Sequence, residues 1–190
     1  RLVTVRTVTT NLDSITAKGI DFEASYRVDL GGDRQLILSG LATYVDELET
    51  VSFGEVVDRA GQTGSAGAVA APDYLLNGTL TYVAPRWSLT LQGRYIPSGK
   101  LDALYIEPGD AGYAPTLVNS INDNRVASRF YMNMFGSVFF GDNRQFEVFG
   151  SVNNLFNKAP AAAPELQFYT NPVYFDSIGR YYRVGVRVKL

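Results

Sequence analysis

Apolar and polar residues alternate with period two along several stretches of this 190-residue chain. From Ile20 to Leu30 every even residue is apolar, whereas the odd residues between them are Asp, Glu, Ser or Arg. Side chains of a β-strand point alternately to the two faces of its sheet, so this segment presents one apolar and one polar face. Its length of about 11 residues is enough to cross a bilayer at a tilt.

The same alternation predicts an all-β chain of about eight strands. Clear alternation covers 74–82, 87–95 and 182–190, and weaker alternation covers 2–10, 35–48, 128–140 and 145–155. The segment 128–140 carries Phe, Tyr or Met at both parities, so its two faces are not distinguished. No run of about 18 apolar residues is present, so the sequence predicts no transmembrane helix.

Short and long connections alternate between these segments. Residues 31–34, 84–86 and 141–144 read as tight turns, whereas the connectors at about 50–72, 98–126 and 156–179 are long and polar or rich in Gly, Ala and Pro. In an up-and-down antiparallel sheet, successive connections emerge at opposite ends. We therefore expect all long loops at one end, as in outer-membrane barrels.

Aromatic residues gather near the expected strand ends. Some lie beside the tight turns (Tyr82, Trp87, Phe139, Phe140, Phe146) and others lie towards the long loops (Tyr44, Tyr74, Tyr95). These positions suit the two interfacial girdles of a membrane barrel. Tyr and Phe are also good strand formers, so each residue taken singly is equally compatible with a soluble sheet.

Composition excludes several classes of function. With 17 Lys and Arg against 19 Asp and Glu, the net charge is −2, and nucleic acid is not an expected partner. The absence of Cys and His removes disulfides, thiol nucleophiles, imidazole bases and the commonest metal ligand. We expect no enzyme activity, no catalytic residue, no cofactor and no metal site. The acidic residues Asp46, Glu47 and Glu49 leave one alternative, oxygen ligation of Ca²⁺.

Two architectures fit the alternation. A soluble β-sandwich would turn the apolar faces into a core, but its connections have no reason to sort into short and long. A membrane barrel explains that sorting. Small residues at polar positions, such as Ser25, Thr79 and Ser88, would underfill a narrow eight-stranded barrel. We therefore expect an antiparallel up-and-down transmembrane β-barrel segment that belongs to a larger barrel.

Three segments carry more specific patterns. Residues 151–158 read SVNNLFNK, residues 171–187 read NPVYFDSIGRYYRVGVR, and residues 17–24 read AKGIDFEA. The first two resemble the v-N-L-F-(D/N)-K signature and the closing strand of TonB-dependent outer-membrane receptors, and the third resembles a strand motif upstream of them. One departure is Leu190, because the last residue of that family is usually aromatic.

The resemblance implies an architecture and a role. The family has a barrel of about 22 strands around a plugged lumen, so residues 1–190 would be its C-terminal section, with the plug domain and earlier strands absent. The implied role is energy-coupled uptake, across the cell outer membrane, of a nutrient such as a siderophore, cobalamin or oligosaccharide. The implied partners are the lipid bilayer, the plug domain, the TonB complex and a small-molecule ligand. A passive porin-like channel and a soluble carbohydrate-binding module remain the alternatives.

Two sets of residues are candidates for contacts. Charges on the polar face would either contact the plug or line a hydrated lumen: Asp21, Glu23, Arg27, Arg94, Glu147, Arg183 and Arg187. Aromatic residues of the long loops would either stack on a ligand or pack the loops: Tyr105, Tyr113, Phe168, Tyr169, Tyr174 and Phe175.

Overall fold

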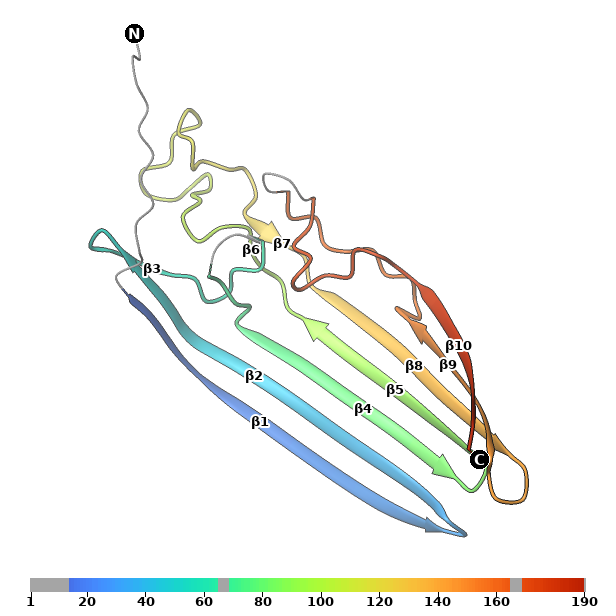
Figure 1. Ribbon diagram of the computed structural model, residues 1–190. Coiled ribbons are helices and arrows are strands. Elements are labelled where there is room, and N and C mark those ends of the chain that lie inside the picture. The colour runs from blue at the N-terminus through green and yellow to red at the C-terminus, as the bar shows by residue number, and fades with distance from the viewer. Residues whose placement is uncertain (1–13, 65–68, 165–168, 190) are drawn as a thin grey trace.

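The computed structural model describes residues 14–64, 69–164 and 169–189, and the regular structure in these ranges is entirely β (Figure 1). Seven strands form one antiparallel sheet in chain order. They are β1 (Ser14–Gly31), β2 (Arg34–Ser52), β4 (Tyr74–Ala84), β5 (Trp87–Ile96), β8 (Arg129–Phe140), β9 (Phe146–Asn153) and β10 (Tyr181–Val188). Short β3 (Glu55–Asp58) pairs with β2, and β6 (Gly99–Lys100) pairs with β7 (Arg125–Val126).

These strands confirm the all-β, up-and-down interpretation of the alternation. Each expected segment from residue 20 onwards coincides with a strand of the sheet. The largest difference is that β1 and β2 have 18 and 19 residues and extend beyond the ends of their neighbours on the long-loop side. The expected strand at 2–10 and the terminal Leu190 lie outside the described residues.

The two kinds of connection separate to opposite ends of the sheet (Figure 1). The tight turns contain residues with positive φ, including Gly31, Gly32 and Asp33 at the first turn and Gly141 and Arg144 at the third. The connections β2–β4, β5–β8 and β9–β10 leave from the other end. The sorting predicted from connector length is therefore confirmed.

The sheet is open within the described residues. β1 pairs only with β2, and β10 pairs only with β9, so each leaves one edge of backbone N–H and C=O groups unpaired by another strand. Such edges can form hydrogen bonds with further strands. The described chain is thus an open all-β meander.

Strand register separates two chemically different faces. One row of paired residues crosses all seven strands and is entirely apolar or aromatic: Tyr26, Leu38, Leu80, Leu91, Met134, Val152 and Tyr182. The adjacent row, on the opposite face, is entirely polar through the first five strands: Ser25, Ser39, Thr79, Gln92 and Asn133. We call these the apolar face and the polar face.

The register also resolves the ambiguous segment 128–140. Phe130, Met132 and Met134 lie on the apolar face, in line with Tyr95, Gly93 and Leu91 of β5. Tyr131, Phe135 and Phe139 therefore lie on the polar face. Phe139 is paired with Glu147, so it does not join the aromatic residues on the apolar face.

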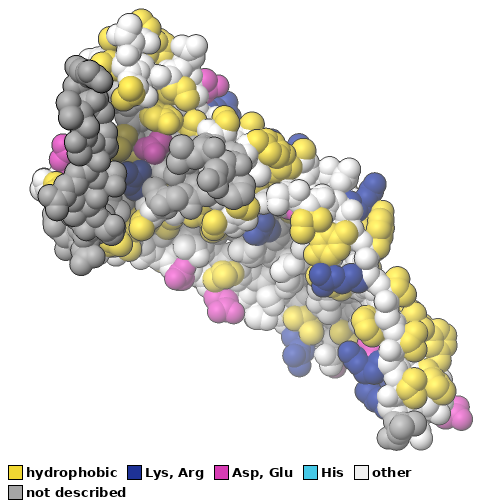
Figure 2. All heavy atoms as spheres, turned by 45° about the horizontal axis from the view of Figure 1, so that its top comes forward, with side chains coloured by type: hydrophobic (Ala, Val, Ile, Leu, Met, Phe, Trp, Pro, Cys, Tyr) yellow, Lys and Arg dark blue, Asp and Glu magenta, His cyan; other side chains and the backbone are white. Residues whose placement is uncertain are grey.

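Nothing in the described residues covers the apolar face. Phe22 of β1 is 65% exposed and Val184 of β10 is 81% exposed, whereas on the central strands, which have neighbours on both sides, Leu80 is 39% exposed and several other side chains are half-buried. Figure 2 shows hydrophobic side chains gathered at the lower right end of the molecule, beside a separate group of Lys and Arg side chains.

The buried hydrophobic core lies away from the apolar face, where the long connections meet the polar face. Its members are Ile96, Leu101, Val126, Tyr131, Ala161, Ala163 and Phe175. Most come from the connections themselves, and Tyr131 comes from the polar face of β8. We call the described parts of the connections 53–73, 97–128 and 154–180 the loop cap.

A β-bulge at Lys18/Gly19 marks the point where β1 and β2 begin to extend beyond the sheet. A Cβ atom added at Gly19 would collide with the backbone carbonyl oxygen of Tyr44. A glycine at this position of the AKGIDFEA segment therefore has a steric reason, because the two backbones approach too closely for a side chain.

We expect Gly19→Ala to destabilise the protein by about 1–3 kcal/mol, as overpacking against backbone does. The matched control is Gly40→Ala, where the nearest atom to an added Cβ is the Asn77 carbonyl oxygen at 3.9 Å. The control should leave stability unchanged or slightly raised. Urea-dependent unfolding followed by circular dichroism measures both variants, and equal effects would contradict the steric account.

Candidate functional site

The charges expected on the polar face do lie there together. Cross-strand pairing aligns Asp21 with Thr43, and Thr43 Oγ1 donates a 2.7 Å hydrogen bond to Asp21 Oδ1. By the same alternation Glu23 and Arg27 lie on this face, and within the described residues neither side chain forms an ion pair or hydrogen bond. The Glu23 and Arg27 side chains are therefore exposed charges on the polar face.

Two charges near the tight-turn end, Arg187 and Glu147, form an ion pair. Arg187 Nη1 donates to Glu147 Oε2 at 2.6 Å, and Ser137 Oγ donates to Glu147 Oε1 at 2.9 Å. The Arg187 guanidinium lies 5.3 Å from the centre of the Phe149 ring, and that ring fills the space above Gly185. These contacts hold the Arg187 side chain against the polar face of the neighbouring strand β9.

Arg183 and Arg94 differ in what they contact. Arg183 lies 5.2 Å from the centre of the Tyr181 ring. Arg94 Nη2 donates a 2.8 Å hydrogen bond to the Tyr174 carbonyl oxygen, and its guanidinium lies 5.6 Å from the centre of the Tyr131 ring. Arg94 therefore anchors the β9–β10 connection to the polar face, a contact with the chain's own loop that the sequence did not indicate.

Backbone hydrogen bonds join the first two connections of the loop cap. Lys100 N donates to the Gly61 carbonyl at 2.8 Å, and Thr63 N donates to the Lys100 carbonyl at 3.0 Å. A Cβ added at Gly99 would overlap the Thr63 side chain, so a glycine permits this approach.

Side chains bring the third connection onto the first. Asn171 Nδ2 donates to the Thr63 carbonyl at 3.1 Å, and the Tyr174 hydroxyl donates to the Ala70 carbonyl at 2.8 Å. Burial raises the pKa of the Tyr174 phenol, because a phenolate would be poorly solvated there. The three connections thus pack as one unit.

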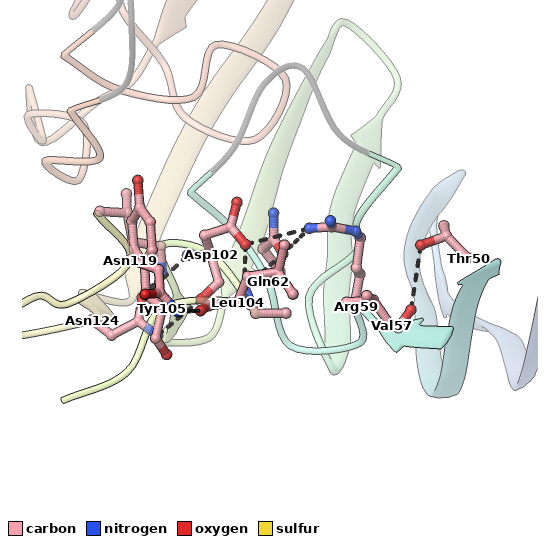
Figure 3. Close-up of polar contacts among 11 residues, drawn as sticks. Thr50, Val57, Arg59, Gln62, Asp102, Leu104, Tyr105, Asn119 and Asn124 are labelled. Atoms are coloured by element: carbon pink, nitrogen blue, oxygen red, sulfur yellow. Dashed lines mark hydrogen bonds and ion pairs between the residues drawn. The ribbon is translucent and has the colours of Figure 1, made fainter. Parts of the chain in front are cut away.

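A buried polar network supports the loop cap (Figure 3). Arg59 Nη1 lies 3.0 Å from Gln62 Oε1 and 3.4 Å from Asp102 Oδ1. Gln62 is fully buried, and its Oε1 also accepts a bond from the Ala103 amide. Asn124 Oδ1 accepts from the Leu101 and Asp102 amides, each at 3.1 Å.

Asp58 caps a turn at the edge of the loop cap. Its Oδ1 accepts hydrogen bonds from the backbone amides of Ala60 and Leu48, each at 3.0 Å. These bonds favour the carboxylate and lower the pKa of Asp58 below its ordinary value of 3.8. The turn is therefore stabilised above that pH and loses this contribution as the pH falls through the folded-state pKa.

The loop aromatic residues occupy different positions. Phe175 is 2% exposed, and Tyr105 and Tyr174 pack against the same core, so these three rings pack the cap and do not form an open stacking platform. Tyr113 is half-buried, and Tyr169 is 60% exposed. Phe168 lies outside the described residues.

Residues of the SVNNLFNK segment organise the start of the β9–β10 connection. Asn154 is 1% exposed and has a positive φ of 49°. Its Nδ2 donates to Asp176 Oδ2 and to the Lys158 carbonyl, each at 2.9 Å, and its Oδ1 accepts from the Lys158 amide at 2.7 Å. Asn157 Oδ1 accepts from the Arg180 amide at 3.0 Å. The two C-terminal motif segments therefore contact each other.

Between the polar face and this connection lies a hollow of about 420 Å³. Asp176 and Ile178 of the connection form one side, and strand residues form the rest: Asn77, Gln92, Arg94, Tyr131, Asn133, Asn153 and Tyr181. Its size falls in the usual range for small-molecule sites. We call it the polar hollow, and Arg94 is its only lining residue among the sequence candidates.

The described residues contain no group of three or more acidic side chains placed to hold a metal ion. In the acidic segment considered for calcium, Glu47 Oε2 pairs with Lys18 Nζ at 2.6 Å, and the Tyr44 hydroxyl donates to Asp46. Glu47 and Asp46 therefore each contact a different partner.

We expect Asn154→Ala to release the β9–β10 connection, because it removes the hydrogen bonds that the buried Asn154 side chain makes to Asp176 and Lys158, each worth about 0.5–1.5 kcal/mol. Amide hydrogen exchange over 176–180 should become faster. The adjacent Asn153→Ala is the control, since the Asn153 side chain makes no hydrogen bond within the described residues. Equal exchange in both variants would refute the anchoring role.

The chain matches no family model, and no curated protein or solved structure is significantly similar to it. The described residues include no helix that is both long and apolar enough to cross a membrane.

Proposed function

We propose that the chain is a section of the wall of an outer-membrane β-barrel, and that this barrel is a TonB-dependent receptor for energy-coupled nutrient uptake. The observation that carries the proposal is the uncovered apolar face. Seven adjacent strands expose it, and between its aromatic ends no charged residue occurs on it in the described strands. Hydrocarbon is the environment that favours such a surface.

Aromatic pairs mark two levels on the apolar face. Tyr82 and Trp87 have ring centres 4.9 Å apart near the tight turns, and Tyr74 and Tyr95 have ring centres 6.1 Å apart near the long connections. Eight residues separate the levels along each strand, which is about 26 Å. A strand tilt of about 40° reduces this to a height of about 20 Å, close to the apolar band of membrane barrels.

The free edges of β1 and β10 support a larger closed structure. A bilayer offers no water to hydrogen-bond an open strand edge, so a sheet in lipid has to close. Further strands pairing with these edges would satisfy them. The small side chains on the polar face, such as Ser25 and Ser39, suit the wall of a wide lumen.

The assignment to TonB-dependent receptors rests on the motif resemblance and on the contacts of its residues. Asn154, Asn157 and Asp176 of the two C-terminal segments join the end of β9 to the start of β10. A soluble carbohydrate-binding module is disfavoured, because it would need a second layer over the apolar face and the described residues supply none. A passive porin-like channel shares the wall, and uptake that depends on the proton gradient would distinguish the receptor from it.

Adjacent residues on opposite faces test membrane insertion. Leu80 lies on the apolar face between the aromatic levels, nearer to Tyr82 than to Tyr74, and Thr79 lies on the polar face. We expect Leu80→Lys to destabilise the protein in lipid by about 1–3 kcal/mol, because a charge in hydrocarbon costs about 2–4 kcal/mol at the bilayer midplane and less towards the interfaces. Thr79→Lys should cost much less.

The measurement is urea-dependent unfolding in phospholipid vesicles, followed by heat-modifiable gel mobility. Equal sensitivity at the two positions would contradict the proposed lipid contact. Recovery of the unaltered protein as a freely soluble monomer would also overturn it.

A further inference from the structure

We propose that the polar hollow binds a neutral, hydroxyl-rich ligand, an oligosaccharide, which is then the nutrient class of the receptor. This inference rests on the proposed function for its role in uptake. The binding itself depends only on the geometry of the hollow, so the two can be tested separately.

Amide side chains dominate the strand wall of the hollow and retain unused hydrogen-bonding groups. Gln92 lines the hollow, and its Oε1 accepts a 3.2 Å bond from Asn133 Nδ2, whereas its Nε2 donor has no partner in the described residues. Within the described residues, the side-chain amides of Asn77 and Asn153 form no hydrogen bond. Amides offer both donors and acceptors, as vicinal hydroxyl groups require.

The charges of the hollow are already occupied by the protein. Asp176 Oδ1 accepts from the Ile178 and Gly179 amides, and its Oδ2 accepts from Asn154. Arg94 donates one hydrogen bond, from Nη2, to the Tyr174 carbonyl. One cation and one carboxylate cancel in charge, so the hollow presents no net charge to an ionic ligand. A multiply charged ferric chelate would need several free cations.

The hollow also offers apolar surface beside its polar groups. Ile178, which is 78% exposed, and the half-buried Tyr181 line the hollow together with the amide side chains. A sugar ring presents hydroxyl groups at its edge and C–H groups on its faces, so it matches a wall of amides combined with aliphatic and aromatic side chains.

The position of the hollow suits a transported ligand. It lies on the polar face directly under the loop cap, where Arg94 joins the cap to the wall. In the proposed barrel this is the lumen just below the long connections, so a ligand bound there would touch both. The strand residues that line the hollow come from β4, β5, β8, β9 and β10. Because they are single Asn and Gln residues far apart in the chain, the sequence gives no signal for the hollow.

The test uses the double variant Asn77→Ala/Gln92→Ala, which removes two amides from the strand wall. The matched control is Thr81→Ala/Thr90→Ala, which removes a hydrogen-bonded side-chain pair from the same two strands outside the hollow. Isothermal titration calorimetry in detergent is run with maltotetraose, cellotetraose, xylotetraose and laminaritetraose. Ferric enterobactin, ferrioxamine and cyanocobalamin serve as the other ligand classes.

We expect at least one tetrasaccharide to bind, with affinity reduced about tenfold or more by Asn77→Ala/Gln92→Ala and unchanged by the control. Three results would each overturn the proposal: no tetrasaccharide binds, a chelate or cobalamin binds in this hollow instead, or the double variant leaves sugar affinity unchanged. Vesicle insertion, measured on the same samples, reports separately on the proposed membrane function.

Discussion

An apolar sheet face that none of the described residues covers is the constraint on which the other features of this molecule depend. Removing one Leu, Val or Phe side chain from water is worth about 1.5–3 kcal/mol. A face that exposes Phe22, Leu80, Val184 and many similar residues would therefore cost more in water than the 5–15 kcal/mol by which proteins are typically stable. In the proposed membrane location, hydrocarbon would remove this cost. The same environment would account for the absence of charge between the aromatic levels and would require that the free edges of β1 and β10 find partners.

The buried core is correspondingly displaced into the loop cap. Phe175, Leu101 and Ile96 pack above one end of the polar face, where water is available on one side and the sheet on the other. Hydrogen bonds from Arg94 to Tyr174 and from Asn171 to Thr63 fix this cap in place. The cap also forms one side of the polar hollow. Stability and the candidate ligand site therefore depend on the same contacts.

Most of the sheet was predictable from the sequence, because the direction of a strand side chain depends only on residue parity. The alternation predicted the two faces, and connector length predicted which end carries the long loops. The loop cap was not predictable, since its contacts join distant residues and lack a period. Asn171 and Thr63 are 108 residues apart. Phe175 was interpreted as either ligand platform or packing, and only the fold distinguishes them. The amides of the polar hollow were missed, because isolated Asn77 and Gln92 look like any polar strand residue.

A single-cysteine scan along β4 tests the central claim most directly, because the chain contains no native Cys. Spin labels at residues 76–82 would be probed in lipid vesicles with oxygen, which concentrates in hydrocarbon, and with a water-soluble nickel chelate. The account predicts a period of two, with oxygen access greatest at even positions such as 76 and 80 and nickel access greatest at odd positions such as 77 and 79. Nickel access that is equally high at both parities would contradict it.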